Sequence, residues 1–328
     1  MTLEIGVDST FAQSVADRLQ SIESRLATAA FADTPFVTEA ATHIINAGGK
    51  RFRPLLVVLA SQLYDGADTD ADAVERAAMV VELTHVASLY HDDVMDEADL
   101  RRGAESANHR WSNSVAIMVG DFLFARASSI VSTLGVDYVA LQAETFARLV
   151  QGQVAETRGP SDGDDAVAHY LQVVADKTGS LIAASARFGG MVCGAPEPVL
   201  RALATFGEEI GVVFQLSDDI IDITSDATGK TPGTDLREGV WTLPTLLVQA
   251  ADDPADARLR ELIGRPLTDP DELAEALALM RAHPALEAAR TEVQRRAEAA
   301  KERLVRLPDS PARDALHELC DRIVSRSS

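Results

Sequence analysis

Residues 89–103 read LYHDDVMDEADLRRG and place three carboxylates in the spacing D-D-x-x-D, directly before two arginines. On a helix over 83–97, Asp92 and Asp96 lie one turn apart, with Asp93 just beside them. Like charges at this spacing destabilise a helix, and more so when they are partly buried. A divalent cation removes the repulsion, and hard carboxylate oxygens are the ligands that Mg²⁺ prefers. The stretch therefore predicts a metal site near the end of a helix.

The same spacing occurs a second time, in FQLSDDIIDITSD over 214–226. An apolar helical pattern again precedes the aspartates, and a basic residue, Lys230, again follows them. Two such acidic faces opposite each other would hold several Mg²⁺ around one polyanion, because Mg²⁺ binds through a few carboxylates plus substrate phosphates. Nearby lysines and arginines would bind the remaining phosphate oxygens. The predicted metal ligands are Asp92, Asp93, Asp96, Asp218, Asp219 and Asp222.

A third charged motif, GGKRFRP over 48–54, places three basic side chains just after a glycine pair. There, backbone and side-chain donors can converge on an anion. Neither this motif nor TGKT over 228–231 is a Walker A loop, because Ile44 and Thr224 occupy the place of the required glycine. A P-loop nucleotide enzyme is therefore a poor fit.

Composition narrows the class of protein. The chain has 328 residues, 46% of them hydrophobic and only 5% aromatic, and its formal charge is -21. This balance favours helix packing over a β-sandwich and argues against nucleic-acid binding. Two distant cysteines suit a reducing compartment. We see no signal peptide, and no apolar run approaches the roughly 20 residues that span a bilayer. A soluble, cytoplasmic protein is predicted.

The hydrophobic periodicity is helical nearly throughout, with no convincing β-strand. We expect an all-α protein whose single domain covers residues 1–328. The acidic stretch 65–72 fails the EF-hand pattern, and we expect Asp72 to cap the next helix with Glu75 as its capping-box partner. Helical patterns cover 11–29, 34–47, 71–97, 114–134, 138–157, 166–193, 198–223 and 241–251, and much of the C-terminal third.

Five motifs in order, over about residues 45–245, resemble the trans-isoprenyl diphosphate synthases, also called polyprenyl synthetases. The resemblance implies a helical bundle around a deep central cavity, usually homodimeric. It implies Mg²⁺-dependent condensation of isopentenyl diphosphate with an allylic diphosphate. The product would be a longer trans-polyprenyl diphosphate. The motifs are GGKRFRP, HDDVMDEADLRRG, Lys177-Thr178-Gly179, FQLSDDIID and GKTPGTDLREG.

The resemblance also implies roles for individual residues. The two aspartate clusters would hold three Mg²⁺ on the allylic diphosphate, and Gln153 and Glu156 would lie beside them. Thr178 and Gln215 would face the developing carbocation. One departure is Val240, which stands where the family often has a lysine. The positions implied to contact the allylic diphosphate are Arg101, Lys177 and Lys230, and those implied for isopentenyl diphosphate are Lys50, Arg53, His85 and Arg102.

Product length is expected to depend on the helix that precedes Asp92. Residues four and five before it, Ser88 and Ala87, are small, whereas bulky aromatics there would close the space for the tail. We therefore predict a product of C20 or longer. An aromatic residue on the 114–134 helix, such as Phe122 or Phe124, is a candidate for the cavity floor.

Two other functions stay open at this point. A class I terpene cyclase also ionises allylic diphosphates on Mg²⁺, but it resembles one D-D-x-x-D motif plus a different second cluster. A non-catalytic regulatory subunit of a partner synthase would be favoured by degenerate aspartate motifs, and both motifs here are intact. The final chain length, the preferred primer and the downstream pathway do not follow from the sequence.

Overall fold

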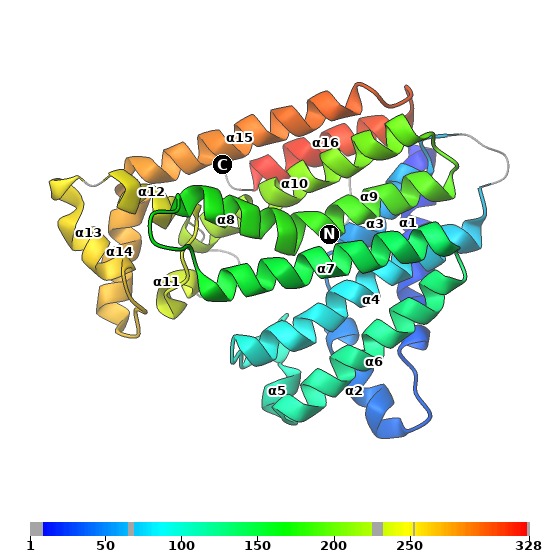
Figure 1. The fold of residues 1–328 in the computed structure, drawn as a ribbon, viewed down its shortest axis with the longest axis horizontal. Coiled ribbons are helices and arrows are strands. Elements are labelled where there is room, and N and C mark those ends of the chain that lie inside the picture. The colour runs from blue at the N-terminus through cyan, green and yellow to red at the C-terminus, as the bar shows by residue number, and fades with distance from the viewer. Residues whose placement is uncertain (1–8, 65–68, 225–231, 252, 327–328) are drawn as a thin grey trace. The chain divides into compact units, whose positions relative to one another are not determined.

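The computed structural model describes residues 9–64, 69–224, 232–251 and 253–326, and these are almost entirely helical (Figure 1). The predicted all-α class is confirmed. The elements of the first half are α1 Ser9–Ala29, α2 Pro35–Asn46, α3 Phe52–Ser61, α4 Ala71–Met95, β1 Leu100–Arg101, β2 Ala104–Glu105, α5 Ala107–Arg110, α6 Asn113–Ser132 and α7 Val136–Arg158. The elements of the second half are α8 Ala166–Val174, η1 Ala175–Gly179, α9 Ser180–Val192, α10 Glu197–Thr224, α11 Thr234–Glu238, α12 Leu243–Ala251, η2 Pro254–Asp256, α13 Ala257–Ile263, α14 Pro270–Ala282, α15 Pro284–Leu304 and α16 Pro311–Ser325.

The contacts within the chain define two compact units. Unit 1 comprises Met1–Ala147, Leu181–Gly207 and Leu304–Leu316, and unit 2 comprises Arg148–Ser180, Glu208–Arg303 and His317–Ser328. The first aspartate motif therefore belongs to unit 1 and the second to unit 2. That the chain forms one domain over residues 1–328 stays a prediction.

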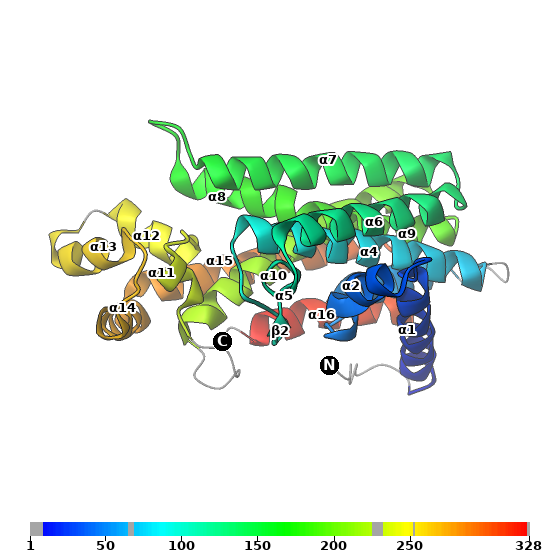
Figure 2. The ribbon, with the colours of Figure 1, turned by 90° about the horizontal axis from the view of Figure 1, so that it is seen from below.

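Helix α4 is the centre of unit 1. It contacts α1, α3, α5 and α6, and α6 runs alongside it in both views (Figures 1 and 2). Nearly all of its residues from Ala77 to Tyr90 are buried, on every side of the helix. An all-round apolar helix of this kind is stable only inside a core. The helix that carries the first motif is therefore held rigidly by its neighbours.

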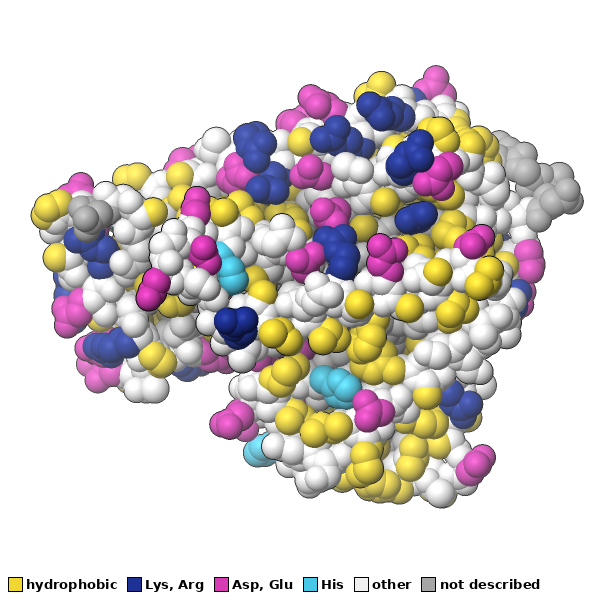
Figure 3. All heavy atoms as spheres, in the orientation of Figure 1, with side chains coloured by type: hydrophobic (Ala, Val, Ile, Leu, Met, Phe, Trp, Pro, Cys, Tyr) yellow, Lys and Arg dark blue, Asp and Glu magenta, His cyan; other side chains and the backbone are white. Residues whose placement is uncertain are grey.

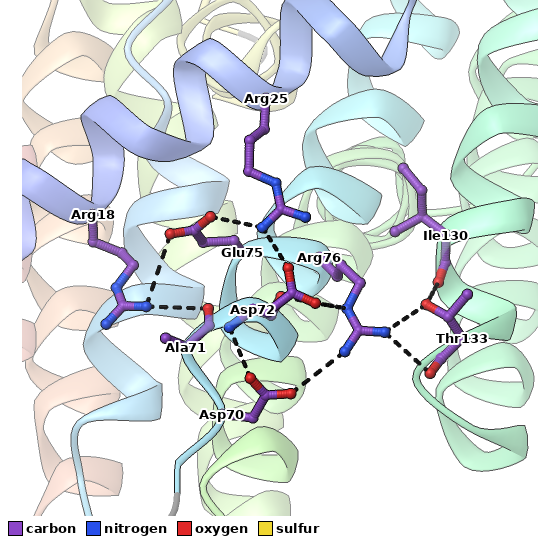
Figure 4. Close-up of polar contacts among 9 residues, drawn as sticks. All are labelled: Arg18, Arg25, Asp70, Ala71, Asp72, Glu75, Arg76, Ile130 and Thr133. Carbon is purple, nitrogen blue, oxygen red and sulfur yellow. Dashed lines mark hydrogen bonds and ion pairs between the residues drawn. The ribbon is translucent and has the colours of Figure 1, made fainter.

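The start of α4 differs from the sequence-based prediction. The N-cap is Asp70, whose side chain accepts a hydrogen bond from the Asp72 backbone N at 2.9 Å. Asp72 and Glu75 instead bind Arg25 of α1, at 2.7 and 2.8 Å (Figure 4). Arg76 adds a link to the C-terminal end of α6. The predicted capping box is wrong because an arginine from a distant helix binds both of its carboxylates.

Helix α6 corrects the prediction that no apolar run approaches the length of a membrane span. Among the described residues it is the one helix long and apolar enough to cross a membrane by length and composition. Only 33% of its apolar window is buried, although it packs against α4. Core helices of soluble proteins pass the same test. The side chains of Ile117 and Met118 are 44% and 61% exposed.

A short hairpin after α4 was not expected from the sequence. Strands β1 and β2 pair antiparallel, Leu100 opposite Glu105 and Arg101 opposite Ala104. The turn between them has positive φ angles at Arg102 (55°) and Gly103 (79°). Strands of two residues carry too little alternation to be recognised as a pattern. The hairpin turns the chain back on itself just after the first aspartate motif, so that Arg101 reaches Asp93 of α4.

The predicted helix over 166–193 contains a π-helical segment, η1, between α8 and α9. Lys177 and Thr178 lie on η1, and π-helical segments are frequent at functional sites. Within unit 2, α7 approaches η1 very closely at Gly152. A Cβ atom at that glycine would lie 2.7 Å from the backbone N of Lys177. This glycine therefore sets the distance between α7 and the segment that carries two candidate site residues.

Candidate active site

One stripe of α4 stays partly exposed although the rest of the helix is buried. His85, Leu89, Asp92 and Asp96 lie on this stripe. Ser88, one turn before Asp92, is only 7% exposed. Residues at spacings of three and four along the helix thus share one partly exposed face, although Ser88, at a position with the same spacing, is buried. Two of the three aspartates of the first motif are open to solvent at its end.

The middle aspartate of the first motif is buried and paired. Arg101 donates from Nε and Nη2 to Asp93 Oδ1, both at 2.6 Å. Burial raises the pKa of Asp93, and the charge of Arg101 opposes this rise. The second oxygen, Oδ2, is buried and has no hydrogen-bond partner. A buried acceptor without a partner is uncommon, so this oxygen remains available for a cation or its hydration shell.

The GGKRFRP loop is held by Glu82, a buried carboxylate that lies on α4 one turn before His85. Arg51 donates to Glu82 at 2.9 Å and to Glu23 of α1, and its own backbone is left-handed at φ 48°. Arg102 packs against the loop so closely that a Cβ atom at Gly49 would lie 2.9 Å from its Cζ. Arg51 is therefore a structural residue that orders the loop, a role the resemblance did not assign.

Two of the predicted isopentenyl diphosphate ligands meet in this region. Arg53 has a buried Nε without a hydrogen-bond partner, and burial lowers the pKa of its guanidinium to about 10. Although part of the His85 side chain is exposed, the atoms packed around its ring desolvate it and hold its pKa well below the usual value, and the nearby Arg53 and Arg102 lower the pKa further. A neutral imidazole beside buried guanidiniums can donate to an anion without adding to the charge repulsion. Lys50 lies exposed on the same loop.

In unit 2 the outer aspartates of the second motif are partly exposed. Asp218 accepts a hydrogen bond from Arg326, near the C-terminus, at 2.8 Å. Asp222 accepts hydrogen bonds from the backbone N atoms of Thr234 and Asp235, at 3.2 and 3.1 Å. Asp222 thus anchors the start of α11, whereas Asp218 attracts a cationic side chain.

The middle aspartate of the second motif is buried, as in the first. Asp219 is 2% exposed, the Tyr170 hydroxyl donates to its Oδ2, and Gln215 Nε2 donates to its Oδ1 at 3.1 Å. Burial raises the pKa of Asp219 to about 7, against the two hydrogen bonds, which lower it. Both oxygens are therefore engaged by the protein itself.

The segment η1 brings Lys177 and Thr178 to residues of unit 2 that the sequence also indicated. Lys177 Nζ donates to Glu156 at 2.5 Å, and Thr178 Oγ1 donates to Gln215 Oε1 at 3.4 Å. Gln153 is buried, and its Oε1 has no hydrogen-bond partner. Lys230 lies outside the described residues.

In the part of the chain that the structure describes, no three Asp, Glu, His or Cys side chains converge as a metal site. The candidate ligands belong to two units, and Asp93, Asp218, Asp219 and Asp222 are each paired with protein donors. Three contributing residues were missed: Glu82, Tyr170 and Arg326. Tyr170 lies seven residues before Lys177, a helical spacing that could have indicated it, whereas the link from Arg326 to Asp218 joins distant parts of the chain.

Comparison with known proteins identifies this combination of helices and motifs. Residues 34–280 match the polyprenyl synthetase family. The chain belongs to this family, as the five motifs implied.

Relatives and solved structures agree over nearly the whole chain. The chain is 47% identical over 321 residues to nonaprenyl diphosphate synthase of Mycobacterium tuberculosis, covering 97% of this chain and 95% of the relative. The crystal structure of geranylgeranyl pyrophosphate synthase from Corynebacterium glutamicum, complexed with calcium and isoprenyl diphosphate, matches with a TM-score of 0.88 and 44% identity, covering 99% of this chain and 100% of that one. A decaprenyl diphosphate synthase from Rhodobacter capsulatus matches with a TM-score of 0.85 and 33% identity, covering 97% and 98%. The protein is a polyprenyl diphosphate synthase.

Proposed function

We propose that this enzyme condenses isopentenyl diphosphate with an allylic diphosphate, in the presence of Mg²⁺, to give a trans-polyprenyl diphosphate of C20 or longer. The observation that carries the proposal is the family match over residues 34–280, which includes both aspartate motifs. Each motif presents two partly exposed carboxylates at the end of a buried helix.

The side chains that the structure describes fit a divalent metal. The partly exposed donors of both motifs are carboxylate oxygens, which suit Mg²⁺, and Asp93 Oδ2 is a buried acceptor with no partner. We propose three Mg²⁺ on the allylic diphosphate. When bound, they supply positive charge that stabilises the leaving diphosphate. The residues proposed to hold Mg²⁺ are Asp92, Asp93, Asp96, Asp218 and Asp222.

The protein's own side chains would perform the remaining work. The allylic C–O bond breaks, and Arg101 and Lys177, with Lys230, bind the departing diphosphate. Thr178 and Gln215 turn oxygen atoms toward the allylic cation. The double bond of isopentenyl diphosphate then attacks this cation, forming a C–C bond, and a proton leaves to the released diphosphate. The product is one isoprene unit longer. The residues proposed to bind isopentenyl diphosphate are Lys50, Arg53, His85 and Arg102.

This assignment agrees with the charge required at each step. The barrier to ionisation is charge separation, so fixed cations beside the leaving group lower it. Arg53, whose buried Nε has no hydrogen-bond partner, and His85, whose lowered pKa favours the neutral ring, are the donors proposed for the isopentenyl diphosphate anion. None of these steps needs a strong acid or a nucleophilic side chain. A dry, apolar environment protects the cation from water.

We also propose that the enzyme is a cytoplasmic homodimer. The apolar side chains that α6 leaves exposed, among them Ile117 and Met118, support a contact with a second copy better than a membrane crossing. Figure 3 shows hydrophobic side chains gathered over the region of α6 in unit 1. Exposed apolar patches of this kind mark interaction surfaces.

Product analysis by mass spectrometry tests the proposed function. Purified protein, Mg²⁺ and isopentenyl diphosphate are incubated separately with dimethylallyl, geranyl, farnesyl and geranylgeranyl diphosphate. We expect a discrete linear product of C20 or longer, and none when Asp92 is replaced in the Asp92→Ala variant. Cyclised products would indicate a terpene cyclase. Elongation only after a partner synthase is added would indicate a regulatory subunit.

A further inference from the structure

Burial sets Asp219 apart from the other aspartates of the second motif. Both oxygens of Asp222 also accept hydrogen bonds, from the backbone N atoms of Thr234 and Asp235, but Asp222 stays partly exposed. Asp219 is 2% exposed, and both of its oxygens accept hydrogen bonds, one from the Tyr170 hydroxyl and one from Gln215 Nε2 at 3.1 Å. Asp218 and Asp222 are partly exposed on the same helix. A buried carboxylate whose oxygens are both engaged by protein donors is poorly placed to bind a metal ion as well.

The hydrogen bond from Gln215 has a direction. A carboxylate accepts hydrogen bonds and does not donate them, so the NH₂ end of the Gln215 amide must face Asp219. The carbonyl oxygen, Oε1, is then directed away from Asp219, and it accepts a hydrogen bond from Thr178 Oγ1 at 3.4 Å. Thr178 uses its proton in this contact, which leaves lone pairs on its own oxygen. The chain of contacts from Tyr170 to Thr178 thus fixes which end of each polar group is presented.

The orientation matters for the reaction. A carbonyl oxygen carries the negative end of the amide dipole and stabilises a cation, whereas a reversed amide would present NH₂ and destabilise it. We propose that Asp219 is a positioning residue: it holds the Gln215 amide with its oxygen toward the allylic cation, and Tyr170 holds Asp219 in place. The inference deepens the proposed function and rests on it, because it presumes that Gln215 and Thr178 face the cation.

Tyr170 belongs to the same hydrogen-bonded network as Asp219 and Gln215. Its hydroxyl reaches Asp219 from α8, the helix that leads directly into η1. One hydrogen bond therefore links the helix before Lys177 and Thr178 to the helix of the second aspartate motif. Without the hydroxyl, Asp219 would keep the hydrogen bond from Gln215 but lose the one that holds its other oxygen, and its carboxylate could rotate.

The first test separates positioning from metal binding. Mn²⁺ is titrated into purified wild type and into the Asp219→Ala, Tyr170→Phe and Asp218→Ala variants, with inorganic diphosphate present, and free Mn²⁺ is measured by electron paramagnetic resonance. We expect Asp219→Ala and Tyr170→Phe to keep the wild-type number of bound ions, and Asp218→Ala to lose binding. Loss of Mn²⁺ binding in Asp219→Ala to the same degree as in Asp218→Ala would overturn the inference.

The second test asks whether Asp219 acts through Gln215. Rates of elongation are measured for Asp219→Ala, Gln215→Ala and the double variant. Loss of a positioning partner costs about 10- to 100-fold in activity, here expected in kcat with both KM values within about twofold. Because residues that act as one unit are not additive, the double variant should be no slower than Gln215→Ala. Multiplicative losses would overturn the inference.

The two tests also distinguish this inference from the proposed function. If wild type elongates no primer, the proposed function fails, and the Mn²⁺ titration still decides whether Asp219 binds metal. Circular dichroism and thermal melting identify any variant that fails to fold. Tyr170→Phe keeps the ring in the core and loses only the hydroxyl. If Asp219→Ala unfolds, Tyr170→Phe can still be compared with wild type and with Asp218→Ala.

Discussion

At the scale of residues, the two D-D-x-x-D motifs use their members in the same way. In each, the first and last aspartates are partly exposed and the middle one is buried. The middle carboxylates differ in their hydrogen bonding. One oxygen of Asp93 has no hydrogen-bond partner, whereas both oxygens of Asp219 accept hydrogen bonds. Helical geometry explains the pattern, since positions four apart share a face while the position between them turns toward the core.

Arg326 forms an ion pair with Asp218, one of the carboxylates proposed to bind Mg²⁺. The two side chains are 29% and 38% exposed and lie 2.8 Å apart, and Arg326 also covers the ring of Phe214. Because Mg²⁺ and Arg326 compete for one carboxylate, Arg326→Ala should strengthen metal binding by about two- to fivefold, the range for a pair of this exposure. Titration of the substrate-free protein with Mn²⁺ measures the change. Arg322→Ala, which removes a pair with Glu318 on the same helix, is the control; equal affinities for the two variants would contradict the competition.

His85 should make folding stability depend on pH. Burial lowers its folded-state pKa well below the usual value of about 6.5, so below that pH the unfolded chain binds a proton that the folded protein excludes. Stability from this residue is therefore complete above about pH 6.5 and falls as the solution is acidified toward the folded-state pKa. Urea unfolding at several pH values between about 5 and 8 measures the slope. His85→Gln should flatten it, and an unchanged slope in that variant would assign the dependence to other groups.

Which site residues could be predicted depends on how far apart their partners lie in the sequence. The two aspartate motifs and the Lys177-Thr178 pair are local, so their spacing indicated them. Glu82 was missed because a single glutamate inside an apolar helix has no pattern of its own. The contacts of Arg326 and Tyr170 with the second motif span 108 and 49 positions, and no local period encodes such contacts.

At the scale of elements, helix patterns were predicted better than their ends. The patterns over 11–29 and 198–223 match α1 and α10 within two residues. The predicted start of α4 was wrong because Arg25 of another helix binds Asp72, the expected cap. The β1–β2 hairpin was missed because it is too short to produce a periodic signal. Helix ends depend on single side chains, whereas helix existence depends on many residues together.

The close approach of α7 to η1 should be essential for activity. At Gly152 an added Cβ would lie 2.7 Å from the Lys177 backbone N and 3.1 Å from the Asp176 carbonyl carbon, and backbone cannot move aside as a flexible side chain can. Gly152→Ala should therefore displace η1, cost about 1–3 kcal/mol of stability, and reduce kcat/KM strongly. Thermal melting and steady-state kinetics measure both. Gln151→Ala, at the exposed neighbouring position, is the control, and a Gly152→Ala enzyme as active as this control would show that η1 tolerates the shift.

The partly exposed stripe of α4 should limit how long the product grows. Ser88 lies beside this stripe, one turn before Asp92, and is 7% exposed, whereas Ala87 is fully buried. A large ring at Ser88 would fill space beside the growing tail, so Ser88→Phe should shorten the main product by one or more isoprene units. Mass spectrometry of products from a fixed primer measures the length. Ser88→Ala removes the hydroxyl without adding bulk and should keep the wild-type length; a shortened product there would mean that bulk is not the cause.

At the scale of the whole molecule, the net charge of -21 opposes the binding of anionic substrates. The arginines near His85 and the metal ions proposed for the aspartate motifs must therefore overcome a repulsive long-range field. Composition favoured the all-α class, which is confirmed, and argued against nucleic-acid binding, which stays a prediction. It could not predict the α6 surface, because the same apolar helix suits a protein core, an interface between copies or a membrane.

The exposed apolar side chains of α6 give the last prediction, which concerns assembly. Met118 is 61% exposed on a helix of mean hydropathy 1.5, and a charge placed there would be costly to bury against a second copy. Met118→Glu should convert the proposed dimer to a monomer at micromolar concentration, as measured by light scattering after size-exclusion chromatography. Val305→Glu, at a site that is 79% exposed away from α6, should leave the dimer intact. A wild-type protein that is monomeric at all concentrations would refute the homodimer, and a dimer that survives Met118→Glu would move the interface away from α6.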